Sequence, residues 1–158
     1  DNYGEEKNYF VNDAPIYSAL AMCMECAGRK KEALRYWQLA TSTKGAPTVH
    51  SYFQCIALRA MNRQDEAEQL AHEMMRLGET RIANAAVNDY YGVGAPAYPP
   101  FGYDIVKAHT LSGRQMTAFA SLALGDVARA QQDAEAIRQI DSADFSLYLL
   151  DLLLSKTL

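Results

Sequence analysis

One short segment of this chain occurs three times with a similar layout of residue types. Residues 28–33 read Gly-Arg-Lys-Lys-Glu-Ala, and residues 62–67, 34 positions later, read Asn-Arg-Gln-Asp-Glu-Ala. A third copy, Gly-Asp-Val-Ala-Arg-Ala, occupies residues 125–130, 63 positions after the second. An interval of about 34 residues is the length of one helix pair in a class of helical-repeat proteins. The spacing therefore predicts stacked helix pairs, with an interruption between the second and third copies.

Each copy also has small residues where two helices would cross. The side chain is Ala or Cys seven positions before the Gly or Asn that opens each copy, and again five positions after it. Antiparallel helices approach to about 8 Å only if their crossing point carries small side chains. The opening residues themselves, Gly28, Asn62 and Gly125, tolerate the left-handed backbone of a tight helix turn. The six small residues are Ala21, Ala33, Cys55, Ala67, Ala118 and Ala130.

In these positions the chain resembles the tetratricopeptide (TPR) repeat family. The resemblance implies an all-α fold, an α-α superhelix of about eight helices that is built from TPR-like hairpins and interrupted by a long Pro/Gly/aromatic loop. The first unit is the closest match, since the second and third lack its bulky Tyr17 and Leu20. The expected parts are hairpin 1 at about 13–43, hairpin 2 at about 48–78, an insertion at about 79–103, hairpin 3 at about 104–141 and a terminal helix at about 144–156.

Local signals predict where individual helices begin and end. Asp104 and Asp126 each precede an apolar-periodic stretch and are expected to cap a helix. Gly78 is expected to stop the fourth helix, because glycine is the commonest residue after a helix C-terminus. An apolar face within residues 81–91 then predicts a separate short helix.

The composition predicts a globular domain with no strong charge preference. The chain has 158 residues, of which 49% are hydrophobic and 22% charged, and its formal net charge is −4. No stretch reaches the roughly 20 apolar residues that cross a bilayer. An acidic chain has no general attraction to polyanions, so we expect neither nucleic acid nor a membrane as a partner. Because the chain begins at Asp1 without methionine, we expect it to be a piece of a longer protein. The absence of a signal peptide and the expected reduced thiols favour a cytoplasmic location.

The three cysteines raise the question of redox or metal chemistry. Cys23 and Cys26 form a Cys-Met-Glu-Cys motif, but they fall late in the first expected helix, whereas a thioredoxin-like pair occupies a helix N-terminus. A structural zinc site needs four ligands, and neither Cys55 nor the three histidines have the required spacing. We therefore expect free thiols that are buried or partly buried. We expect no metal and no cofactor.

The segment between the second and third copies is the most distinctive part of the chain. Residues 92–103 contain three glycines and three prolines, which exclude a regular helix. Residues 92–97 are similar to a dinucleotide-binding fingerprint, but the prolines prevent the helix that this motif requires. The aromatic side chains either anchor the loop to the helices or stack on a ligand such as a sugar ring or a proline-rich peptide. These candidate loop contacts are Tyr90, Tyr91, Tyr98, Phe101 and Tyr103.

A second resemblance covers nearly the whole chain. Residues 90–96 (Tyr-Tyr-Gly-Val-Gly-Ala-Pro), 100–105 (Pro-Phe-Gly-Tyr-Asp-Ile) and 122–126 (Leu-Ala-Leu-Gly-Asp) look like the C-terminal repeat region of large uncharacterised bacterial proteins. In those proteins a β-sandwich module related to galactose mutarotase precedes the repeats. The resemblance implies that this chain is the helical tail of a larger, sugar-related protein whose active site lies in another part.

The expected function is a non-catalytic protein–protein interaction or interdomain scaffold module, because no residues form a catalytic set. The alternative is an accessory domain of a carbohydrate-active protein, whose loop aromatics contribute to sugar binding. The terminal helix is apolar around most of its circumference, and we expect it to self-associate or to dock on a neighbouring domain. In the TPR family the first helix of each hairpin lines a groove. The corresponding residues are Ser18, Met22, Glu25, Tyr52, Ile56, Arg59, Gln115, Phe119 and Leu122.

Overall fold

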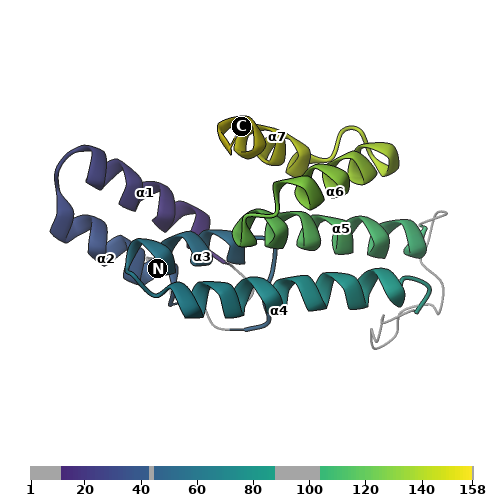
Figure 1. Cartoon of the computed structure of the whole chain (residues 1–158), viewed down its shortest axis with the longest axis horizontal. Coiled ribbons are helices and arrows are strands. Elements are labelled where there is room, and N and C mark those ends of the chain that lie inside the picture. The colour runs from purple at the N-terminus through teal and green to yellow at the C-terminus, as the bar shows by residue number, and fades with distance from the viewer. Residues whose placement is uncertain (1–11, 43–44, 88–103, 158) are drawn as a thin grey trace, which may run out of the picture. The chain divides into compact units, whose positions relative to one another are not determined.

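The chain is all-helical in the part that the structure describes, which comprises residues 12–42, 45–87 and 104–157. This computed structural model contains seven helices in those ranges and no strand (Figure 1). The all-α class expected from the sequence is therefore confirmed. In chain order the helices are α1 (Ala14–Cys26), α2 (Lys30–Ala40), α3 (Ser51–Ala60), α4 (Gln64–Ala83), α5 (Ile105–Leu124), α6 (Val127–Ile140) and α7 (Phe145–Thr157).

The helices belong to two compact units that divide between Leu70 and Ala71, within α4. In unit 1, α1 and α2 form a hairpin, and α3 packs against both of them. The buried residues of this unit are mostly alanines gathered around Trp37, which is 3% exposed. The indole Nε1 of Trp37 donates a hydrogen bond of 2.9 Å to Oε1 of Glu25, so a polar bond also joins α1 to α2. The half-buried rings of Tyr17 and Tyr36 stack across the two helices with their centroids 6.5 Å apart and pack against this cluster, so small residues and aromatic rings together fill the space between α1 and α2.

The three hairpin turns have the same backbone geometry. Gly28, Asn62 and Gly125 have φ values of 74°, 61° and 80°, all in the left-handed region. After each of them an amide N–H reaches back five residues to a carbonyl, from Arg29 to Met24, from Arg63 to Leu58 and from Asp126 to Ser121, at 2.8–2.9 Å. This bond defines the Schellman motif, in which the left-handed residue ends the helix. The predicted turn positions are therefore confirmed in all three copies.

The six small residues that the repeat predicted at helix crossings are all buried. Ala33 is 1% exposed and the other five are fully buried. The first two copies also share an ion pair, which joins Arg29 to Glu32 after the first turn and Arg63 to Glu66 after the second. These pairs span three residues on exposed helix surface and contribute little to stability. The common features of the hairpins are consequently the turn and the small residues.

In unit 2, α5 and α6 form a hairpin and α7 packs against both of these helices. Asp104 and Asp126 cap α5 and α6 as predicted: each carboxylate accepts a hydrogen bond from the backbone N–H three residues later, at 2.9 Å and 3.0 Å. Such caps satisfy amides that have no partner within the helix. Met74, Ile137 and Leu150 are the largest fully buried apolar side chains of the unit.

Two glycines, Gly78 and Gly113, allow α4 and α5 to come into close contact. The prediction that Gly78 ends the fourth helix was wrong. Gly78 does not end a helix; α4 continues without a break to Ala83, and no separate helix follows it among residues 84–87. A Cβ atom added to Gly78 would lie 2.8 Å from Cγ2 of Thr117, and one added to Gly113 would lie 2.9 Å from the carbonyl oxygen of Gly78. Gly78 is thus required for packing against α5. The described residues accordingly contain seven helices in place of about eight.

Charged side chains reinforce the packing of α4, α5 and α6. Arg129 on α6 pairs with Glu79 on α4 at 2.6 Å, and Arg114 on α5 pairs with Asp133 on α6 at 2.7 Å. Asp133 is 2% exposed, and its second oxygen has no hydrogen-bond partner among the described residues. Removing Arg114 would leave the buried carboxylate of Asp133 without its hydrogen-bonded ion-pair partner, which is costly.

Candidate interaction surface

The last helix, α7, begins at an aspartate that is held from two sides. Asp144 Oδ1 accepts a hydrogen bond of 2.9 Å from the backbone N–H of Ser146, which is an N-terminal capping arrangement. Its other oxygen, Oδ2, accepts a bond of 2.8 Å from the side-chain amide of Gln115 on α5. These bonds cap α7 and tie its first turn to α5.

The two sides of α7 differ in exposure, although both carry large apolar side chains. Leu147, Leu150 and Leu154 are buried on the side of α7 that packs against α5 and α6. On the opposite side Phe145, Tyr148 and Leu152 are 83%, 72% and 42% exposed. Residues three and four apart share one face of a helix, so these three form a continuous apolar surface, which we call the α7 outer face. Large exposed apolar side chains grouped in this way are typical of surfaces that contact another protein.

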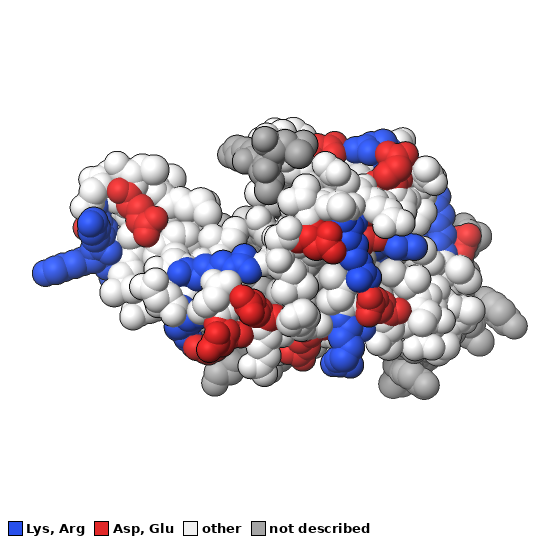
Figure 2. Space-filling model, in the orientation of Figure 1, with Lys and Arg blue, Asp and Glu red and all other residues white. Residues whose placement is uncertain are grey.

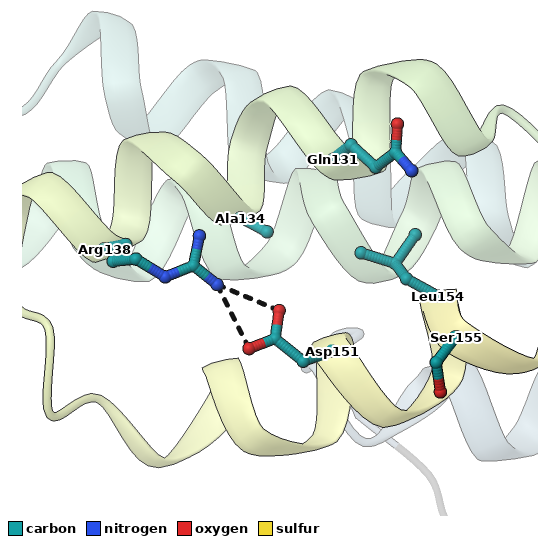
Figure 3. A pocket seen from close by; sticks show the side chains of 6 residues that line it. All are labelled: Gln131, Ala134, Arg138, Asp151, Leu154 and Ser155. Carbon is teal, nitrogen blue, oxygen red and sulfur yellow. Dashed lines mark hydrogen bonds and ion pairs between the residues drawn. The ribbon is translucent and has the colours of Figure 1, made fainter.

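A shallow pocket of about 330 Å³ lies between α6 and α7 (Figure 3). The guanidinium of Arg138 spans it and binds both oxygens of Asp151, at 2.9 Å and 3.1 Å, and it also pairs with Glu135 at 2.8 Å. Hydrogen bonds to Glu135 and Asp151 raise the pKa of Arg138 above its usual value. The only cation of the pocket lining is thus engaged by two carboxylates. The lining residues are Gln131, Ala134, Arg138, Asp151, Leu154 and Ser155.

The groove residues predicted in unit 1 are only partly accessible. Ser18 is fully buried, and its hydroxyl donates to the backbone carbonyl of Phe53 at 3.1 Å, so it cannot contact a partner and that assignment was wrong. Glu25 is exposed, but its carboxylate accepts the bond from Trp37. Met22 is exposed, while Tyr52, Ile56 and Arg59 are half-buried. Burial raises the pKa of the Tyr52 phenol, and the charge of Arg59 opposes that shift.

The groove residues predicted in unit 2 belong mainly to its interior. Phe119 is 2% exposed, so it is a core residue and not a groove residue. Gln115 is half-buried and binds Asp144, and Leu122 is half-buried. Ser18 and Phe119 were assigned to the groove from their positions in the repeat. Their burial could not be predicted in this way, because it depends on which helix packs over each position. The candidate loop contacts Tyr90, Tyr91, Tyr98, Phe101 and Tyr103 lie outside the described residues.

The cysteines are free, but the expectation that all of them are buried or partly buried was wrong. Cys55 is buried, whereas Cys23 and Cys26 are both exposed on α1. Burial raises the pKa of the Cys55 thiol to about 11. Within the described ranges, His, Cys, Asp and Glu form no group of three or more that could hold a metal ion.

Surface charge is mixed on the face drawn in Figure 2. Acidic and basic side chains alternate there, and neither sign gathers into a large patch.

None of the helices in the described ranges has both the length and the apolar character needed to cross a membrane. No protein-family model matches the chain, and no solved structure gives a significant match to it. The exposed apolar residues Phe145, Tyr148 and Leu152 make the α7 outer face the candidate interaction surface.

Proposed function

We propose that this chain is a non-catalytic interaction module built from TPR-like helical hairpins, and that the α7 outer face is its contact with another protein. Three turns of the same geometry and six buried small residues at the repeat positions support the relation to helical-repeat proteins. In such proteins the units serve as rigid supports for a binding surface.

The exposure of α7 carries this proposal. A terminal helix of a helical-repeat protein needs a polar outer side to remain in water. Here Phe145 and Tyr148 are more than two-thirds exposed, and Leu152 continues the same apolar face. Aromatic side chains give large contact area at low cost in conformational entropy, and they are enriched at protein interfaces. Burial of these three residues against a protein would remove an otherwise unfavourable exposure.

Self-association of the chain provides the direct test. Sedimentation velocity over a range of protein concentrations is expected to show concentration-dependent association, because a second copy offers the same apolar face. The double variant Phe145→Ser/Tyr148→Ser is expected to shift that association to higher concentration. Val106→Ser is the matched control, since Val106 is also exposed, at 50%, but lies on α5. A wild-type chain that stays monomeric throughout rules out a second copy as the partner, and a control that weakens association equally contradicts the assignment of the contact to the α7 outer face.

A further inference from the structure

Two exposed thiols lie together at the end of α1. Cys26 is the last residue of the helix and Cys23 precedes it by three positions, so the two side chains share one face. Both are free and exposed, whereas Cys55 is buried. We call Cys23 and Cys26 the α1 thiol pair. A solvent-exposed pair at this spacing is accessible to reagents that the third cysteine cannot meet.

Of the two residues between the thiols, Met24 and Glu25, the second is hydrogen-bonded to the only tryptophan of the chain. Glu25 lies one position before Cys26, and its Oε1 accepts the 2.9 Å hydrogen bond from Nε1 of the buried Trp37. A change in the backbone of the last turn of α1 would therefore move the acceptor of that bond. The indole environment of Trp37 reports on the state of this turn.

We propose that the α1 thiol pair is a modification site, at which low-molecular-weight disulfides oxidise Cys23 and Cys26 to a reversible disulfide within α1. This site differs from a thioredoxin-like catalytic pair, which occupies a helix N-terminus where the helix dipole stabilises the thiolate. The exposure of both thiols and their position on one helical face carry the proposal.

The reaction proceeds by two thiol–disulfide exchanges. The thiolate of one cysteine attacks a sulfur of the small disulfide, which breaks the small S–S bond, releases one small thiol and leaves a mixed disulfide on the protein. The thiolate of the other cysteine then attacks the protein sulfur of that mixed disulfide and releases the second small thiol. The two protons lost by the cysteines are balanced by those taken up by the two leaving thiolates. The protein pair is oxidised by two electrons, and the small disulfide is reduced by two.

The end of a helix is a suitable place for this ring closure. Helical neighbours three apart have Cβ atoms about 5–6 Å apart, whereas a disulfide needs about 3.5–4.5 Å, so the last turn has to tighten. Cys26 is followed by Ala27, which has left the helix, and by the left-handed Gly28. The adjustment is therefore confined to the turn and its hydrogen bonds, such as the 3.0 Å bond from the Ala27 N–H to the Cys23 carbonyl. An exposed disulfide of this kind is readily reduced again by thiols.

Mass spectrometry of the chain after incubation with glutathione disulfide tests the proposal. The expected product has lost two hydrogens, carries no glutathione, and contains a peptide in which Cys23 and Cys26 are joined. Dithiothreitol is expected to restore the starting mass. A native chain in which neither thiol reacts, or in which Cys23 and Cys26 retain separate glutathione adducts, overturns the proposal.

Variants of the cysteines distinguish the internal disulfide from other products. Cys26→Ser is expected to stop at a stable glutathione adduct on Cys23, because the resolving thiol is absent. Cys55→Ala is the matched control and is expected to oxidise like the wild type, since a buried thiol whose pKa is raised to about 11 stays protonated at neutral pH. Trp37 fluorescence is expected to change on oxidation of the wild type and to recover on reduction. Loss of internal oxidation in Cys55→Ala, or an unchanged fluorescence, contradicts the assignment.

Discussion

The α1–α2 hairpin and the α4–α5 crossing both bring two helices close together, by different means. In the hairpin, Ala21 and Ala33 are buried on either side of a left-handed glycine turn, and all three positions recur in the other copies. At the crossing, Gly78 and Gly113 have no counterpart in the repeat, and each excludes a Cβ because of the other helix. The same residue type thus has two roles: Gly28 supplies a backbone conformation, and Gly78 supplies space.

The largest effect is expected where the hairpin depends on one side chain. Trp37→Ala removes the most deeply buried ring between α1 and α2 and leaves Glu25 without its partner. Truncation of a buried aromatic residue costs about 3–5 kcal/mol of the free energy of unfolding. Urea denaturation followed by circular dichroism measures it. Trp37→Phe is the control that keeps most of the bulk, and an equally large loss in that variant would mean that the hydrogen bond outweighs the packing.

A single methyl group at the α4–α5 crossing is expected to have the next largest effect. The Cβ of Gly113→Ala would lie 2.5 Å from Cγ1 of Ile82 as well as against the Gly78 carbonyl, and backbone cannot move aside at low cost. Overpacking of this kind destabilises by about 1–3 kcal/mol. Thermal denaturation of the purified variant provides the measurement. If Gly113→Ala is as stable as the wild type, the two helices do not approach as closely as described.

The second copy has Cys55 where the other two have alanine, and this thiol is expected to make the free energy of unfolding depend on pH above about 9. Burial raises the pKa of Cys55 to about 11 from a model-peptide value of 9.0, so the unfolded chain loses this proton first. The neutral, buried Cys55 thiol contributes on the order of 2 kcal/mol to the free energy of unfolding. This contribution is fully present below about pH 9 and is lost as the pH rises towards 11. The difference in unfolding free energy between wild type and Cys55→Ala, followed across this range, measures it. A difference that does not vary with pH contradicts the burial of the thiol.

The turn glycines are expected to show the smallest effect of the four. A Cβ added to Gly28 or Gly125 meets no atom within 4 Å, so alanine there costs only the strain of a left-handed backbone, about 1 kcal/mol. Chemical denaturation of Gly125→Ala measures this cost. Asn62→Gly is the reciprocal test at the same φ and is expected to be neutral or slightly stabilising. If Gly125→Ala lost as much stability as Gly113→Ala, the turn glycines and the crossing glycines would not differ in the way proposed, as sources of backbone conformation and of space.

Features that depend on neighbours in the chain could be predicted from the sequence. The left-handed turns and the caps at Asp104 and Asp126 are confirmed, because each requires only a few consecutive residues. Features that depend on distant residues could not. A glycine at position 78 is typical of a helix end, and only the close approach of Gly113 on α5 explains why a glycine lies inside α4. The burial of Ser18 and Phe119 and the exposure of Cys23 and Cys26 likewise depend on which helix covers each position.

The sequence by itself determined the helical class, the hairpin turns and the small residues at the crossings, because helix periodicity and backbone conformation are properties of short segments. Only the tertiary structure decided which surfaces remain open. Large apolar residues occur on both sides of α7 in the sequence. Because Leu147, Leu150 and Leu154 pack onto α5 and α6, Phe145, Tyr148 and Leu152 face solvent. A side chain becomes buried only when a segment distant in the sequence packs over it, so composition alone does not predict which residues are buried.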